Sequence, residues 1–337
     1  MLAATDQELV DGVLGEPGAR QRRAIAKTIT LLESTLAEHR ARADDVLNTL
    51  LPASGNSLRL GISGVPGVGK STFIETLGLH LIEQGHRVAV LAVDPSSSIS
   101  GGSILGDKTR MERLSVHPRA FIRPSPARGT LGGVAEMTRE AMRICEAAGY
   151  DVVIVETVGV GQSETAVANM TDIFVLLQLP NAGDDLQAIK RGVMELADLV
   201  LINKADLDPD AALRARAQIT SALRLMGLQG HPERAHHDAG QWHPQVLLVS
   251  ALNGQGVADF WRAAQQFREL AVASGRLTMR RHEQDQAWMW ERIDAGLKAR
   301  FRAHPAVCAA LPEFSEQVRA GQLAASVAAR RLLDLFH

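Results

Sequence analysis

A glycine-rich turn joins two different residue patterns in the stretch Leu58-Arg-Leu-Gly-Ile-Ser-Gly-Val-Pro-Gly-Val-Gly-Lys-Ser-Thr72. The residues before the turn form a short apolar run, and those after it are amphipathic. A phosphate-binding loop requires this order of strand, loop and helix, because glycines let backbone N–H groups hold phosphate oxygens at a helix N-terminus. The predicted nucleotide-binding residues of the loop are Gly64, Val65, Pro66, Gly67, Val68, Gly69, Lys70, Ser71 and Thr72.

Two side chains of this loop are expected to act on the nucleotide directly. Lys70 brings positive charge to the β- and γ-phosphates, which makes it a predicted catalytic residue. The hydroxyl of Ser71 can bind Mg²⁺.

The rest of the chain predicts an α/β fold of the P-loop NTPase class, with a mostly parallel central sheet. Apolar runs alternate with longer amphipathic segments, a pattern typical of parallel strands covered on both faces. The runs span residues 58–63, 88–93, 152–155, 173–179, 199–202 and 246–249. Helical patterns precede and follow this region, and Gly15-Glu-Pro-Gly18 divides the first of them. We expect an N-terminal helical extension at 1–56, a nucleotide domain at 57–272 and a C-terminal helical segment at 273–337.

The purine base is predicted to be guanine. Asn203-Lys204-Ala-Asp206 follows an apolar run, and the Asp206 carboxylate can accept hydrogen bonds from both N1–H and N2–H₂ of guanine. Adenine offers no such donor pair, so buried polar groups would stay unpaired, at about 1–3 kcal/mol each. Ser250-Ala251-Leu252 follows the last run and is expected to complete the base pocket with backbone N–H groups.

Acidic residues follow two further runs. Asp94 and Glu156 end predicted strands beside the phosphate loop, where they would face phosphates and metal. With Asp107 and Ser71 they form the predicted Mg²⁺ set, since Mg²⁺ prefers oxygen ligands. Asp94 and Gly159 are also predicted catalytic residues, Gly159 through a backbone N–H to the γ-phosphate.

Composition narrows the class of partner and the compartment. Lysine and arginine total 36 against 38 acidic residues, so neither nucleic acid nor an anionic membrane is an expected partner. Only two cysteines occur, and no apolar run reaches the ~18 residues of a membrane span. We expect a cytoplasmic protein without disulfide bonds.

The histidine-rich segment around 230–243 favours no specific metal, because its spacing fits no fixed ligand pattern. Trp288 and Trp290 are expected to pack or to form an oligomer contact.

Longer motifs resemble one family, the methylmalonyl-CoA mutase-associated G proteins of the MeaB/ArgK group. They are Val93-Asp-Pro-Ser-Ser97, Ser103-Ile-Leu-Gly-Asp-Lys-Thr-Arg-Met111, Arg123-Pro-Ser-Pro126, Glu156-Thr-Val-Gly-Val-Gly-Gln-Ser-Glu164 and Leu179-Pro-Asn-Ala-Gly-Asp-Asp-Leu-Gln-Ala-Ile-Lys190. The resemblance covers almost the whole chain, including both helical extensions.

This resemblance implies a homodimeric GTPase chaperone of an adenosylcobalamin-dependent acyl-CoA mutase, with GTP/GDP and Mg²⁺ as cofactors. Residues 273–337 would be its dimerisation arm, and a cobalamin adenosyltransferase would be a further partner. The resemblance also implies that Asp184, Gln187 and Lys190 form a switch facing the mutase. Their i, i+3 spacing would place all three along one helix face.

Two alternatives stay open from the sequence. A metallochaperone GTPase for metal insertion shares this domain class, but it needs a Cys/His metal site near the switches, and Cys145 and Cys308 are not placed for one. A kinase linked to amino-acid transport would need an acceptor pocket, for which the sequence offers no distinct motif. The GTPase hypothesis predicts slow intrinsic turnover, because no arginine finger is evident.

Overall fold

The structure is a computed structural model that describes residues 2–34, 36–93, 111–125, 131–157, 163–180, 191–227 and 242–336. It divides into two compact units, Met1–Leu277 and Thr278–His337. Residues 1–56, predicted as a separate extension, are part of the first unit. The division into a helical extension at 1–56, a nucleotide domain at 57–272 and a dimerisation arm at 273–337 remains a prediction.

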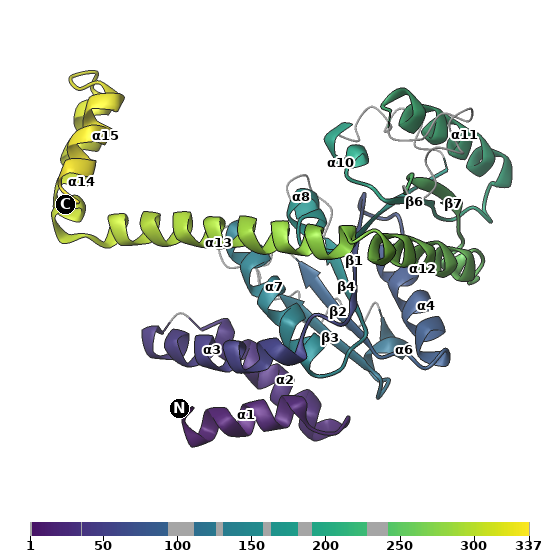
Figure 1. Ribbon diagram of the computed structural model, residues 1–337. Coiled ribbons are helices and arrows are strands. Elements are labelled where there is room, and N and C mark those ends of the chain that lie inside the picture. Colours follow the sequence, from purple (N-terminus) through teal and green to yellow (C-terminus); the bar gives the residue numbers. More distant parts are fainter. Residues whose placement is uncertain are drawn as a thin grey trace. The chain divides into compact units, whose positions relative to one another are not determined.

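A seven-stranded sheet forms the centre of the first unit (Figure 1). Its order is β3-β2-β4-β1-β5-β6-β7, and every neighbouring pair is parallel. The strands are β1 (Leu58–Gly64), β2 (Val88–Val93), β3 (Ala120–Ser125), β4 (Val152–Thr157), β5 (Ile173–Gln178), β6 (Leu199–Ile202) and β7 (Gln245–Leu248). The predicted α/β class with a parallel central sheet is confirmed.

Strand β3 was not predicted from the sequence. Its apolar run is only Ala120-Phe-Ile122, and Arg123 and Pro124 follow at once. Proline cannot donate a hydrogen bond to a neighbouring strand, so a proline-containing strand is found at a sheet edge. β3 lies at such an edge, paired with β2 alone.

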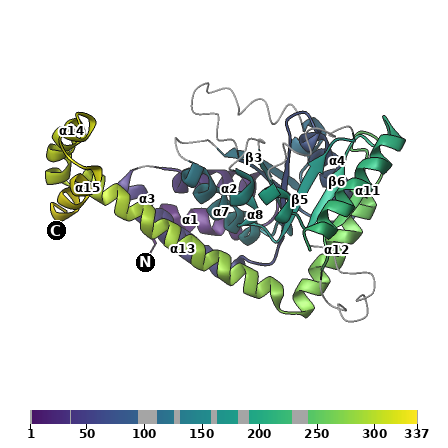
Figure 2. The same cartoon turned by 90° about the horizontal axis from the view of Figure 1, so that it is seen from above.

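Helices cover both faces of the sheet, as Figures 1 and 2 show. One face packs against α4 (Lys70–Glu83), α6 (Glu112–Ser115) and α12 (Val257–Ala273). The opposite face packs against α7 (Leu131–Ala147), α8 (Ser163–Ala168), α10 (Arg191–Glu195) and α11 (Pro209–Leu225). Alternate strand residues feed the two cores, since neighbouring side chains on a strand point to opposite faces.

The N-terminal helices α1 (Ala4–Leu14), α2 (Ala19–Leu32) and α3 (Ala37–Leu50) extend the second of these cores outward over α7. A 3₁₀ turn, Leu51–Ala53, leads from them to β1. The buried amide of Gln21 donates to the backbone oxygens of Val13, Gly15 and Ala148 at 2.9, 2.9 and 3.0 Å, and it accepts from Arg87 at 2.7 Å. One side chain on α2 thus joins the helix turn before it to the loop after α7.

A buried ion pair holds α7 to β1. Arg59 Nε and Nη2 donate to the two carboxylate oxygens of Glu146 at 2.7 and 3.0 Å, and the two side chains are 4% and 0% exposed. Ser57 Oγ also donates to Glu146 at 2.7 Å. Burial alone would raise the pKa of Glu146, but the bonds from Arg59 and Ser57 hold it below its ordinary value.

The second unit contains most of α13 (Arg276–Ala303), with α14 (Pro305–Arg319) and α15 (Ala325–Asp334). Phe301 and His304 make edge-to-face contacts with Phe336, so the end of the chain packs against the turn between α13 and α14. Among the described helices, none is both long and apolar enough to cross a membrane.

We predict that Arg59→Leu destabilises the first unit by about 3–5 kcal/mol, because it leaves the Glu146 carboxylate buried without the guanidinium that bonds both of its oxygens. The loss should be smaller at acid pH. The pKa of Glu146 is lowered in the folded protein, so the stabilisation is present above the unfolded pKa and disappears as pH falls through the folded pKa. Urea unfolding at pH 7 and pH 4 measures both effects.

The control for this prediction is Arg319→Leu, which removes an exposed i, i+3 ion pair with Glu316. It should change stability little, because exposed ion pairs contribute little. Equal effects of the two substitutions would contradict the role given to Arg59.

Candidate nucleotide-binding site

The phosphate loop connects β1 to α4 with two glycines that no larger residue can replace. A Cβ at Gly64 would lie 2.6 Å from the Leu177 backbone oxygen, and one at Gly69 would lie 2.6 Å from Asn203 Nδ2. Gly69 also has a φ of 95°, a left-handed conformation that other residues rarely adopt. The loop therefore takes its shape from close contacts with β5 and with the loop after β6.

Lys70 is the first residue of α4 and is folded back over the loop. Its Nζ donates to the backbone oxygens of Gly64 and Val65 at 2.7 and 3.3 Å, and the residue is 8% exposed. The ammonium group thus lies at the loop that would surround the phosphates. From there it can exchange carbonyl oxygens for phosphate oxygens, which are stronger charge-assisted acceptors.

Ser71 and Glu156 lie together beside Lys70. Ser71 Oγ donates to Glu156 Oε1 at 3.1 Å, and Glu156 is 6% exposed at the end of β4. The next residue, Thr157, donates to Ser63 at 2.9 Å, which fixes the ends of β4 and β1 together. A hydroxyl and a carboxylate are oxygen donors of the kind Mg²⁺ prefers, so this pair fits a nucleotide-bound Mg²⁺.

Asn203 bridges the phosphate loop and the loop after β7. Its Nδ2 donates to the Val68 oxygen at 2.8 Å, and its Oδ1 accepts from the Ala251 N–H at 3.0 Å. The residue is 1% exposed, so both bonds are shielded from water. The two loops expected at opposite ends of a nucleotide therefore share one buried amide.

Lys204 adds a second link, because its Nζ donates to the Gly67 oxygen at 3.0 Å. Its φ of 60° is the one left-handed value among the described non-glycine residues. This conformation turns the chain between Asn203 and Asp206. Asn203 and Lys204 therefore bond the phosphate loop, while Asp206 faces the loop after β7.

Asp206 is exposed and faces the loop after β7. Its Oδ2 accepts from Asn253 Nδ2 at 3.2 Å, which positions the carboxylate while leaving it open to solvent. This arrangement suits a carboxylate that reads a base entering from solvent.

The loop after β7 uses two of its backbone donors inside the protein. The N–H of Ser250 bonds Gln255, and that of Ala251 bonds Asn203. These two N–H groups already have partners within the protein, and the part of Ser250 and Ala251 in a base pocket remains a prediction. Leu252 is 83% exposed, and its part in a base pocket remains a prediction.

Two residues of the site were missed from the sequence. Thr76 on α4 donates to the Ala251 oxygen at 2.7 Å, and Asn253 contacts Asp206 as described. Asn253 could have been found as a short polar residue beside Ser250-Ala-Leu252. Thr76 gives no signal, because its role depends on how α4 meets a loop about 175 residues later.

Several predicted site residues lie outside the described ranges. They are Asp94, Asp107 and Gly159 of the catalytic and metal sets, Asp184, Gln187 and Lys190 of the partner switch, and most of the histidine-rich segment. Among the residues that are described, no group of three or more His, Cys, Asp or Glu could hold a metal ion.

We predict that Asp206→Asn shifts base preference from guanine to xanthine, because the amide can donate to the oxygen that replaces the N2–H₂ group. GTP affinity should fall by roughly 10–100-fold, as expected for one or two unpaired polar groups. Competition between GTP and XTP measures this. Asp210→Asn, on the exposed first turn of α11, is the control, and unchanged guanine preference in the Asp206 variant would sink the assignment.

We predict that Asn203→Ala weakens nucleotide binding and lowers the unfolding temperature, since it leaves the Val68 oxygen and the Ala251 N–H without their partner. Asn203→Asp keeps an acceptor for Ala251 but loses the donor to Val68. It also places a buried carboxylate oxygen against the Val68 oxygen, so it should lose at least as much stability as the alanine variant and disturb the phosphate loop as well. Wild-type GDP affinity and unfolding temperature in both variants would contradict the bridge.

Comparisons with known proteins agree on one family. A sequence model of the methylmalonyl-CoA mutase-associated GTPase MeaB family matches residues 25–306. The chain is 50% identical over 337 residues to "Probable GTPase Rv1496" of Mycobacterium tuberculosis, covering 99% of this chain and 97% of that protein. It is 44% identical over 346 residues to the mouse protein "Methylmalonic aciduria type A homolog, mitochondrial", covering 99% and 81%.

A solved structure resembles the whole chain. The crystal structure of an LAO/AO transport system kinase aligns with a TM-score of 0.74 and 36% identity, covering 99% of this chain and 98% of that one. Its fold is that of a P-loop NTPase, as is the fold described above. With the fold of a P-loop NTPase and these relatives, the protein is a GTP-hydrolysing enzyme that belongs to the methylmalonyl-CoA mutase-associated GTPase family.

Proposed function

We propose that the protein is a GTP-hydrolysing chaperone of methylmalonyl-CoA mutase or a closely related acyl-CoA mutase. In this role it gates the loading of adenosylcobalamin and protects or reactivates the mutase. The family match over residues 25–306 is the observation that carries the proposal. The mouse relative, whose name refers to methylmalonic aciduria, supports it.

The proposed site assignments follow the sequence motifs. Lys70, Asp94 and Gly159 act on the phosphates, and Ser71, Asp94, Asp107 and Glu156 hold Mg²⁺ and its waters. Mg²⁺ bound with GTP would neutralise charge on the β- and γ-phosphates. The contact of Ser71 with Glu156 and the position of Lys70 on the phosphate loop support the described members of these sets.

We propose that the residues of this chain position GTP but hydrolyse it slowly by themselves. Lys70 orients phosphate oxygens, the Asn203 bridge fixes the distance between the phosphate and base loops, and Asp206 selects guanine. Positioning and charge stabilisation are the main contributions of a protein to phosphoryl transfer. We therefore propose slow intrinsic hydrolysis that the mutase accelerates.

A homodimer formed through the second unit is part of this proposal. On α13, Met289, Ile293 and Leu297 recur at four-residue intervals and are 50%, 38% and 50% exposed. Such an apolar stripe on a helix favours pairing with another helix. The proposed compartment is the cytoplasm, in keeping with unpaired Cys145 and Cys308. A cobalamin adenosyltransferase is the proposed source of cofactor.

We predict that purified methylmalonyl-CoA mutase increases GTP turnover by this protein, and that GTP and GDP differ in how they permit adenosylcobalamin transfer to the mutase. Phosphate release and the cobalamin absorption spectrum measure the two effects. Lys70→Ala should abolish both, because it removes charge at the phosphates. Turnover that does not respond to the mutase, together with transfer that is the same with GTP and GDP, would overturn the chaperone role but not the GTPase activity.

The same assay tests the predicted partner switch. Alanine at Asp184, Gln187 or Lys190 should leave intrinsic turnover within a few-fold and reduce the mutase-stimulated rate, as expected of a coupling element. Alanine at Asp210, an exposed residue on α11, is the matched control. If all three switch variants keep full stimulation, the segment is only solvated surface.

A further inference from the structure

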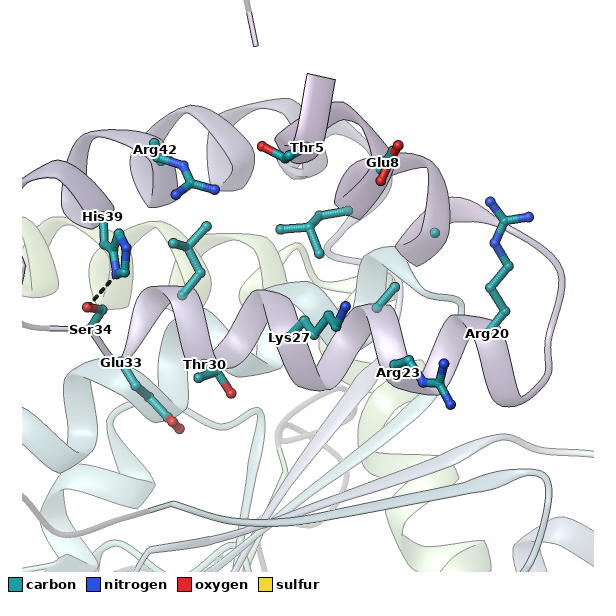
Figure 3. A pocket seen from close by; sticks show the side chains of 14 residues that line it. Thr5, Glu8, Arg20, Arg23, Lys27, Thr30, Glu33, Ser34, His39 and Arg42 are labelled. Atoms are coloured by element: carbon teal, nitrogen blue, oxygen red, sulfur yellow. Dashed lines mark hydrogen bonds between the residues drawn. The ribbon is translucent and has the colours of Figure 1, made fainter. Parts of the chain in front are cut away.

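A cavity of about 720 Å³ lies between the three N-terminal helices, in a part of the molecule that the GTPase reaction does not use (Figure 3). Its residues come from α1, α2, α3 and the α2–α3 loop. Thr5 and Glu8 of α1 stand on one side, and Arg20, Arg23 and Lys27 of α2 stand on the other (Figure 3). The cavity is thus a groove with one cationic wall.

The floor of this groove is apolar. Its two buried lining residues are Gly12 and Ala24, and half-buried Leu9 and Leu31 lie beside them. A Cβ at Gly12 would lie 2.7 Å from the Ala24 Cβ, so this glycine allows α1 and α2 to approach closely below the groove. The floor can accept an apolar side chain but offers it no polar anchor.

Most charged groups at the α3 end already have partners. Arg42 donates to buried Asp6, at 2.7 Å in the shortest contact, and these bonds hold the pKa of Asp6 below its ordinary value. Glu33 pairs with Arg123 at 2.6 Å. These pairs are structural, and they leave the three cations of α2 and the carboxylate of Glu8 as the available charges, so the charge open to a ligand is positive on balance.

The three cations of this wall are exposed, and within the described part of the chain their side chains have no hydrogen-bond or ion-pair partner. They recur at i, i+3 and i+7, so they share one helix face over about 10 Å, or two turns. Like charges at this spacing destabilise a helix slightly. Carboxylates brought by a ligand would remove that repulsion.

We propose that this groove binds an acidic amphipathic helix of a protein partner. Two turns of cations match carboxylates at i, i+3 or i+4, and i+7 on a facing helix, and the apolar floor receives a side chain between them. A small-molecule site normally encloses its ligand and orients it with buried polar groups. Here the buried lining residues carry no polar side chain, which favours the helix.

The test uses a defined probe, a fluorescein-labelled alanine-based helical peptide of about 16 residues. It carries three glutamates at i, i+4 and i+7 on one face with a leucine between them, and a matched peptide carries glutamines instead. Fluorescence anisotropy with the full-length protein should show binding of the glutamate peptide that weakens on raising NaCl from about 50 to 500 mM. The glutamine peptide should bind at least about tenfold more weakly.

The decisive variant is Arg20→Glu/Arg23→Glu/Lys27→Glu, which should weaken peptide binding by at least about tenfold. Its control is Arg214→Glu/Arg216→Glu/Arg224→Glu on α11, which makes the same charge change at exposed sites of the same unit. The milder set Arg20→Gln/Arg23→Gln/Lys27→Gln guards against misfolding. Intrinsic GTP turnover and the unfolding temperature should stay near wild type in the α2 variants.

Equal binding by the two charge-reversal variants would overturn the proposal, as would absence of binding to the wild type. Tripolyphosphate is the third arm. If it binds at micromolar concentration, displaces the peptide and loses affinity in the α2 variants, the groove is a small-anion site and the helix proposal is wrong. The outcome is independent of the proposed chaperone role, because neither mutase nor nucleotide is in the assay.

Discussion

The side-chain amide of Asn203 is the contact on which the nucleotide site most depends. It holds the phosphate loop by the Val68 oxygen and the loop after β7 by the Ala251 N–H. Both loops follow strands of one parallel sheet, so the residues nearest the strands are held by the sheet, and the residues farther along each loop need another contact to fix them. A buried, fully used amide is a strong tie, because breaking either bond leaves a polar group without water. The close approach of Gly69 to the same amide makes glycine necessary there.

The sequence signals from which this site was predicted are local. The glycines, Lys70 and Ser71 lie within one loop, and each residue type has a chemical reason at its position. The assignment of Asn203 to the base rests on its motif and stays a prediction, whereas its bridge between the two loops was not predicted. That role depends on a hydrogen bond over 135 residues of sequence separation, which no local pattern encodes. The missed strand β3 has the same cause, since its short apolar run forms a strand only by pairing with β2.

The N-terminal extension also shows the difference between pattern and packing. Helical periodicity predicted two helices divided at Gly15-Glu-Pro-Gly18, but it missed the second break, between α2 and α3. It did not predict that Gln21 would be buried and joined to the loop after α7, because glutamine usually lies at the surface. Gln21 accepts a hydrogen bond from Arg87, the residue just before β2, so the extension is fixed to the start of that strand. The α2 helix that lines the groove is therefore held in place against the sheet domain.

The edge strand β3 has a consequence for how the chain avoids its own copies. An open parallel sheet leaves a row of unsatisfied N–H and C=O groups at each side, and such a row can recruit a strand from another molecule. Pro124 interrupts the row of donors in β3, and Arg123 beside it is held to α2 by Glu33 and by the Ala26 oxygen. The β3 edge is thus a poor template for pairing with a strand of another molecule. Pro124, which made β3 hard to predict from the sequence, thus also disfavours the addition of a further strand to the sheet.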